Sequence, residues 1–167
     1  MDKQLRQLEQ HLRDLLEEHE AMLRLIQRKR EAVRQARPAV VEDCTERENQ
    51  HVQRIGQIEK ARQELVAQIT TALDAQATEP MRLGQIVERL DEPQRGRLLA
   101  LQAKLRDCME QVRRESRVVA DAMTGLLQHV QGLVQMVAQT VGGGGVYSSR
   151  GRVDAAYAGV SSFSTTG

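Results

Sequence analysis

Apolar residues recur every three or four positions along most of the chain, which is the spacing of one face of an α-helix. In the first segment this stripe consists of Leu5, Leu8, Leu12, Leu15, His19, Met22 and Ile26. Prolines 38, 80 and 93 interrupt the pattern, because a proline ring blocks the preceding helical turn. The pattern therefore predicts four helices, at about 4–37, 39–77, 82–90 and 93–141.

The last predicted helix is the most regular, with strict three- and four-residue spacing from Leu98 to Met136. At about 1.5 Å per residue it would be about 70 Å long, which exceeds the width of a globule of this size. The helices should therefore lie side by side in an all-α, elongated antiparallel bundle or coiled coil. The composition agrees, because Tyr147, Tyr157 and Phe163 are the only aromatic residues and a β-sandwich core normally needs many.

Glycines 142 to 145 should end the last helix, since four consecutive glycines do not hold helical structure. The residues that follow are mainly Ser, Gly, Thr and Ala, which bury too little apolar surface to offset the entropy of ordering. We therefore predict a helical bundle domain at 1–141 and a disordered, flexible tail at 142–167.

The charge balance disfavours nucleic acid as a partner. The chain has 24 basic and 23 acidic residues, whereas a phosphate-binding surface needs a clear basic excess. The most basic stretch, 24–37, is interpreted as a solvated helix face. The chain begins without an apolar leader segment and has no apolar run of membrane-spanning length, so we expect a cytoplasmic protein without membrane insertion. Cys44 and Cys108 are expected to be buried, reduced thiols.

Sequence motifs for catalysis are absent: the chain has no HExxH, CxxC, GxSxG or glycine-rich phosphate loop. The chain is therefore predicted not to be an enzyme and to use no cofactor or metal. One cluster, Cys44, Glu48 and His51, has a spacing that brings three metal-ligand types to one helical face. In a helix this rich in Glu, the cluster is interpreted as a coincidence of composition.

Charge disappears between Asp121 and Arg150, although charged residues recur every few positions before that stretch. Interspersed glutamines exclude a membrane span, which leaves two interpretations. The segment is either a deeply buried core helix or an exposed apolar surface that binds a partner's amphipathic helix. We favour the second, because the other helices offer only narrow stripes to cover it. Gly125 and Gly132 are expected to allow a close approach of that partner.

These features together resemble the flagellar FlgN-type export chaperones. The shared pattern is a long helical hairpin, a short third helix, a long last helix that loses its charge, and a tail with a tyrosine. The most specific local match is the segment 146–151, Val-Tyr-Ser-Ser-Arg-Gly, which is similar to that family's apolar-Tyr-x-x-x-Gly motif. Residues 98–101 and 105–108 are similar to the start of its last helix. Where family members often carry Asn-x-x-Asn, this chain has Val112 and Glu115.

The resemblance implies a cytosolic chaperone that binds the C-terminal helices of hook-filament junction (hook-associated) proteins. It would prevent their premature assembly and deliver them to the type III export gate of the flagellum. Carried over, contact with the cytosolic domain of the gate falls on Tyr147. Client binding falls on the charge-free end of the last helix, at Leu126, Leu127, Val130, Leu133, Val134 and Val137. The alternative is a coiled-coil scaffold that self-associates into a homo-oligomer, or an adaptor protein, without a dedicated client.

Overall fold

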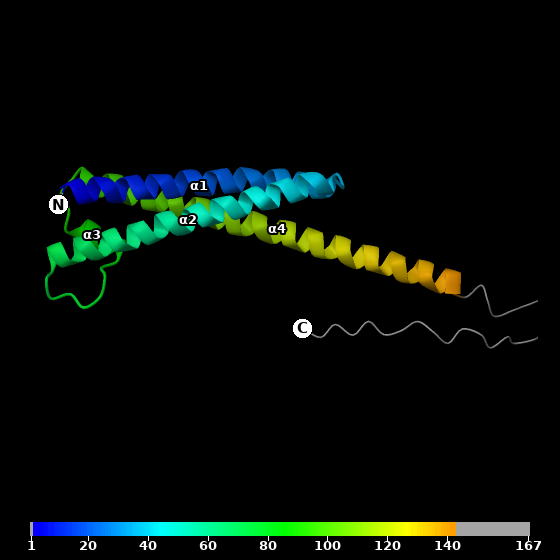
Figure 1. Ribbon diagram of the computed structural model, residues 1–167. Coiled ribbons are helices and arrows are strands. Elements are labelled where there is room, and N and C mark those ends of the chain that lie inside the picture. The colour runs from blue at the N-terminus through cyan, green and yellow to red at the C-terminus, as the bar shows by residue number, and fades with distance from the viewer. Residues whose placement is uncertain (1, 143–167) are drawn as a thin grey trace, which may run out of the picture. The chain divides into compact units, whose positions relative to one another are not determined.

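The computed structural model of the chain describes residues 2–142, which form four α-helices and no strand (Figure 1). The helices are α1 (Asp2–Arg34), α2 (Pro38–Leu73), α3 (Leu83–Glu88) and α4 (Gln94–Gly142). The predicted all-α helical bundle is thereby confirmed. The chain divides into two compact units, residues 1–124 and 125–167, with the boundary inside α4. Apart from Gly142, the predicted tail lies outside the described residues.

α1 and α2 form an antiparallel hairpin within the first unit. Near the turn, Lys29 Nζ of α1 lies 2.8 Å from Glu48 Oε2 of α2. At the other end of the hairpin, Leu8 of α1 and Ile69 of α2 share a hydrophobic cluster. Leucines at three- and four-residue spacing supply the buried face of α1 in this half, as the amphipathic pattern requires.

α1 ends at Arg34, three residues before the predicted end of the first helix at residue 37. Ala36 has a φ of 50°, in the left-handed region, and the Arg37 N–H donates a 2.9 Å hydrogen bond to the Ala32 carbonyl. This bond satisfies a carbonyl at the end of α1 in the manner of a glycine-type C-cap. A side chain with a Cβ in this conformation costs about 1–2 kcal/mol. Pro38 then occupies the first turn of α2, where its missing N–H is harmless.

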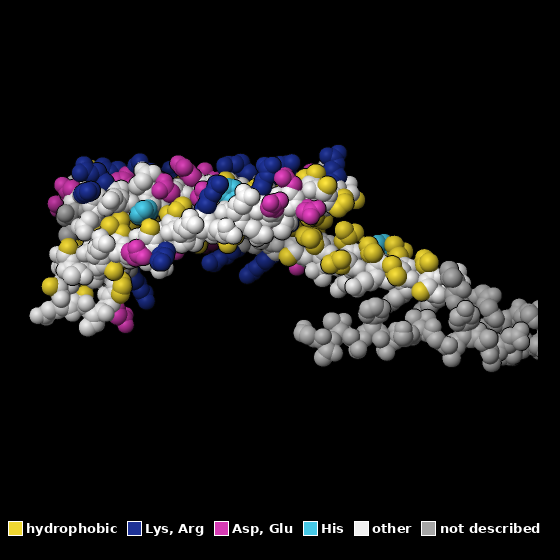
Figure 2. Space-filling view, viewed as in Figure 1, with side chains coloured by type: hydrophobic (Ala, Val, Ile, Leu, Met, Phe, Trp, Pro, Cys, Tyr) yellow, Lys and Arg dark blue, Asp and Glu magenta, His cyan; other side chains and the backbone are white. Residues whose placement is uncertain are grey.

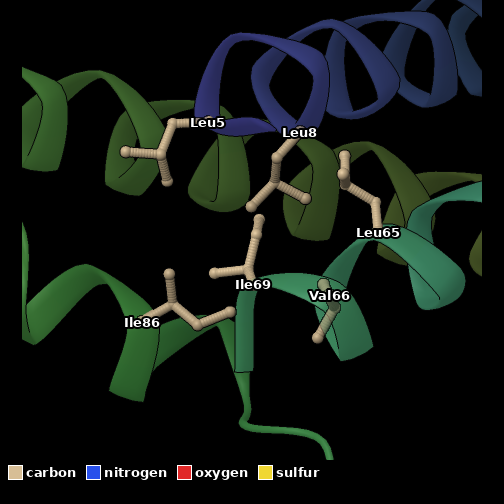
Figure 3. Packing of buried hydrophobic residues seen from close by; sticks show 6 residues of the cluster. All are labelled: Leu5, Leu8, Leu65, Val66, Ile69 and Ile86. Carbon is tan, nitrogen blue, oxygen red and sulfur yellow. The ribbon is translucent and has the colours of Figure 1, made fainter. Parts of the chain in front are cut away.

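A hydrophobic cluster closes the end of the hairpin remote from the turn (Figure 3). Side chains from three helices meet there: Leu5, Leu8, Leu65, Val66, Ile69 and Ile86. Ile86 is fully buried although α3 has only six residues. α3 is therefore held by its apolar contacts with the hairpin, since a helix this short is unstable by itself.

Thr70 fastens the segment before α3 to the hairpin. Its side chain is buried, and its hydroxyl donates a 2.8 Å hydrogen bond to the Val66 carbonyl. The same oxygen accepts a 2.8 Å hydrogen bond from the Met81 N–H. A hydroxyl can serve as donor and acceptor at once, so one side chain satisfies both backbone groups. The contact sets the place at which the chain returns to the bundle.

The first part of α4, up to Thr124, runs parallel to α1. Arg97 Nε lies 3.7 Å from Glu9, and further along both helices Arg30 lies 3.1 Å from Glu115. Met22 and Ile26 of α1 pack with apolar residues of α4, Val112 among them, and Ile55 of α2 joins the same cluster. In the first unit α4 thus faces both α1 and α2.

His19 occupies an apolar stripe position of α1 without a hydrogen bond to its Nδ1, which is buried. Burial lowers the pKa of His19 below its usual value, and the carboxylates of Glu18 and Glu59 oppose that shift only in part. The neutral imidazole is therefore the form that the folded bundle accommodates.

We predict that Thr70→Val lowers the free energy of unfolding by about 1–3 kcal/mol, because the Met81 N–H loses its acceptor. Thr71→Val is the matched control, since the exposed Thr71 hydroxyl only donates to a carbonyl four residues earlier. Its effect should stay within about 0.5 kcal/mol. Urea titrations followed by circular dichroism measure both. Equal losses for the two variants would contradict the anchoring role of Thr70.

We predict that acid destabilises the bundle through His19. A folded-state pKa below the usual 6.5 means that the unfolded chain binds the proton more readily. Stability is thus constant at higher pH and falls as the pH drops through about 6.5 toward the folded-state value. His19→Leu should flatten this dependence, and His129→Gln, at an exposed position, should leave it unchanged. Urea midpoints measured across the pH range test this, and parallel profiles for wild type and His19→Leu would refute it.

Candidate functional site

The described part of the second unit, residues 125–142, is the C-terminal portion of α4. From Leu126 to Val137 its large apolar side chains are all exposed, by between 47% and 63%: Leu126, Leu127, Val130, Leu133, Val134, Met136 and Val137. Scattered exposed apolar residues are ordinary on a protein surface, but seven on three helical turns are not. This segment is the strongest candidate for a binding surface within the described residues.

Six of these side chains lie on one side of the helix. At 3.6 residues per turn they span an arc of about 120°, with Leu133 at one edge and Leu127 at the other. We call this surface the apolar arc, and it consists of Leu126, Leu127, Val130, Leu133, Val134 and Val137. These are the six residues that the sequence assigned to client binding. Met136 is 63% exposed but lies beyond the Leu133 edge.

The opposite side of the segment is polar but uncharged. It carries Gln128, Gln135 and Gln139, and no Asp, Glu, Lys or Arg occurs from residue 122 to residue 149. Figure 2 shows the result, with yellow hydrophobic side chains along this segment and no blue or magenta among them. The arc therefore offers apolar contact area without any full charge to select a partner by ion pairing.

Gly125 and Gly132 do not lie on the apolar arc. By helical periodicity they fall on the polar side, and a Cβ added at either position would meet no atom within 4 Å. The expectation that they let a partner helix approach the apolar face is therefore wrong. Tyr147, the predicted contact with the export gate, lies outside the described residues.

The basic stretch at the end of α1 is engaged within the first unit. Arg28 lies 3.6 Å from Asp43 and Lys29 lies 2.8 Å from Glu48, both on α2. Arg30 lies 3.1 Å from Glu115 on α4. Glu115 is one of the two residues at the family's Asn-x-x-Asn position. The other, Val112, is buried in the core. Three of the six basic side chains of the stretch thus pair with carboxylates on the neighbouring helices.

The cluster of Cys44, Glu48 and His51 is also directed toward α1. Glu48 pairs with Lys29, and His51 Nδ1 forms a 2.5 Å hydrogen bond with Glu18. Burial raises the pKa of Cys44, which disfavours the thiolate that a metal would need. Across the part of the chain that the structure describes, no three His, Cys, Asp or Glu side chains are arranged to hold a metal ion.

None of the helices within residues 2–142 has the length and apolar character needed to cross a lipid bilayer. A search of curated proteins and a search of solved structures each gave no match. A comparison with protein-family models matches residues 1–155 to the family described as FlgN protein. Since the match covers most of the chain, this protein belongs to the FlgN family, a family of chaperones for flagellar type III export.

Proposed function

We propose that this chain binds the C-terminal helices of hook-filament junction proteins in the cytosol and delivers them to the flagellar export gate. Membership of the FlgN family supports the coarser role of an export chaperone. The observation that carries the finer proposal is the apolar arc, six exposed aliphatic side chains on one side of a charge-free helix. The arc is the surface on which the client would lie.

The physical task is to cover a helix that would otherwise assemble too early. Assembly helices carry an apolar face, and such faces associate because burial gains about 25 cal/mol for each Å² removed from water. An arc of aliphatic side chains offers the same gain before assembly begins. Association costs offset part of it, which keeps the complex reversible. Apolar contact of this kind suits a chaperone that must release its client intact.

Delivery requires a second contact, which we assign to Tyr147. This residue follows α4 closely in the sequence, and it is the tyrosine of the segment that resembles the family's tail motif. A tyrosine ring fills an apolar pocket while its hydroxyl bonds at the polar edge, which makes it an effective anchor. Placing client and gate contacts on adjacent segments of one chain raises the effective concentration of the second contact once the first is made.

We predict that Val130→Asp combined with Val134→Asp weakens client binding at least about a hundredfold, because carboxylates would be buried without partners. The matched control is Gln135→Asp with Gln139→Asp, which adds the same charges at the same spacing on the polar side. The control should bind within about threefold of wild type. The probe is the purified C-terminal segment of a hook-filament junction protein from the same bacterium, measured by calorimetry.

Circular dichroism verifies that both of these variants remain helical. Equal affinity of the arc variant and the wild type would rule out this surface as the client site. If the arc instead serves self-association, light scattering will show that the client-free wild type is an oligomer and that the arc variant is a monomer.

We predict that Tyr147→Ala leaves client affinity unchanged and weakens binding to the purified cytosolic domain of the export gate by about tenfold or more. Tyr157→Ala is the control, since it removes the same side chain outside the motif. It should retain both interactions. Loss of client and gate binding together in Tyr147→Ala, or of neither, would contradict the division between the two contacts.

A further inference from the structure

We infer that the apolar arc takes two helices of a single client chain, folded as a hairpin, rather than one helix. This inference rests on the proposed function, because it takes a junction protein as the occupant. It concerns the form in which the client is held, and three observations on α4 carry it: the width of the arc, its register with the buried face of the same helix, and its lack of charge.

The width of the arc exceeds what one partner helix covers. A helix that packs against one other in a two-stranded coiled coil needs apolar residues at two positions in seven. Helices that face the core of a bundle carry about three in seven, in a stripe at least about 100° wide. The six arc residues fall within residues 126–139, two heptads, which gives three in seven. The arc thus has the pattern of a bundle helix with two neighbours.

The arc also repeats the face that α4 buries in the first unit. Each arc residue lies eighteen positions, or about five turns, after a counterpart on the same side of the helix. The counterparts are Cys108, Met109, Val112, Glu115, Ser116 and Val119. All of them except Ser116 are buried or half-buried. The same angular window is therefore covered in the first unit and exposed in the second.

Both helices of the hairpin contribute to that cover in the first unit, since Ile26 of α1 and Ile55 of α2 share a hydrophobic cluster with Val112 of α4. At one edge, Glu115 of α4 pairs with Arg30 of α1. Toward the other edge, Ser116 of α4 lines a cavity of about 150 Å³ together with Glu48 of α2 and with Ile26 and Lys29 of α1. Leu133 occupies the angular position of Glu115, and Val134 that of Ser116. The arc therefore has the angular position of the α4 face that packs against both helices of the hairpin.

The chemistry of the occupant follows from the absence of charge. Leu133 lies at the angular position that Glu115 has in the first unit. A client arginine in the place that Arg30 takes beside Glu115 would therefore lose its water without gaining a carboxylate partner. The two client helices should therefore present aliphatic faces flanked by uncharged polar residues. A hairpin from one chain is favoured over two separate chains, because only one set of translational and rotational freedom is lost on binding.

The test compares variants that damage one edge of the arc at a time. One carries Leu126→Gln with Leu133→Gln, and the other carries Leu127→Gln with Val134→Gln. Each is titrated with the purified full-length junction protein of the same bacterium. If two helices are held, both variants should bind about tenfold more weakly or worse. Light scattering should give one client chain for each chaperone chain. Gln128→Ala with Gln135→Ala, on the polar side, should bind as wild type does.

Three outcomes overturn the inference. An edge variant that binds within about twofold of wild type, while the other edge variant does not, shows that one helix suffices. A complex with two client chains excludes the hairpin. A wild-type chain that binds no junction protein refutes the proposed function as well, whereas either of the first two results leaves that function standing. Circular dichroism of the free variants verifies that α4 is retained.

Discussion

A long amphipathic helix gains most of its stability in water from other helices that cover its apolar face, and α4 has this cover along only part of its length. Within the first unit, its buried side chains pack with Met22 and Ile26 of α1 and with Ile55 of α2. The same face continues into the second unit, where its side chains are exposed. One helix thus serves as a structural element in one part of the chain and as the candidate binding surface in another.

Polar contacts fix the register that apolar packing alone leaves loose. Aliphatic stripes permit neighbouring helices to slide by a turn, because one leucine replaces another with little penalty. The half-buried pair of Lys29 with Glu48 opposes such a shift, since sliding would leave both charges poorly paired. The more exposed pair of Arg30 with Glu115 adds less. Thr70 adds a directional bond at the far end of the hairpin. The geometry of the first unit is therefore set by a few polar side chains within an apolar frame.

Much of the fold could be predicted from the sequence, because its helices have regular stripes and are separated at Pro38, Pro80 and Pro93. Local spacing does not reveal contacts between distant residues. The pairing of His51 with Glu18 and the double role of Thr70 required the tertiary structure. The turn at Ala36 was missed for another reason, since alanine is a strong helix former and sequence gives no sign that it adopts a left-handed conformation.

For the candidate surface too, the sequence pattern predicted which residues form it better than it predicted where they lie. Loss of charge identified the segment, and the family resemblance assigned client binding to the six residues that the structure places on one arc. The prediction for Gly125 and Gly132 was wrong, because it took into account that they lie in the segment but not which side of the helix they occupy. The role of Tyr147 rests on family resemblance, since its position lies outside the described residues.

The uncharged character of residues 122–149 has a consequence for the conditions in which the proposed client would be bound. Dissolved ions screen attraction between charges, with a range of about 8 Å at physiological ionic strength. The association of aliphatic surfaces involves no charges, so ions do not screen it. A cell that shrinks or swells changes its internal ion concentration, and ion pairs such as Arg30 with Glu115 weaken or strengthen accordingly. Binding through leucine and valine side chains alone would depend much less on such osmotic changes.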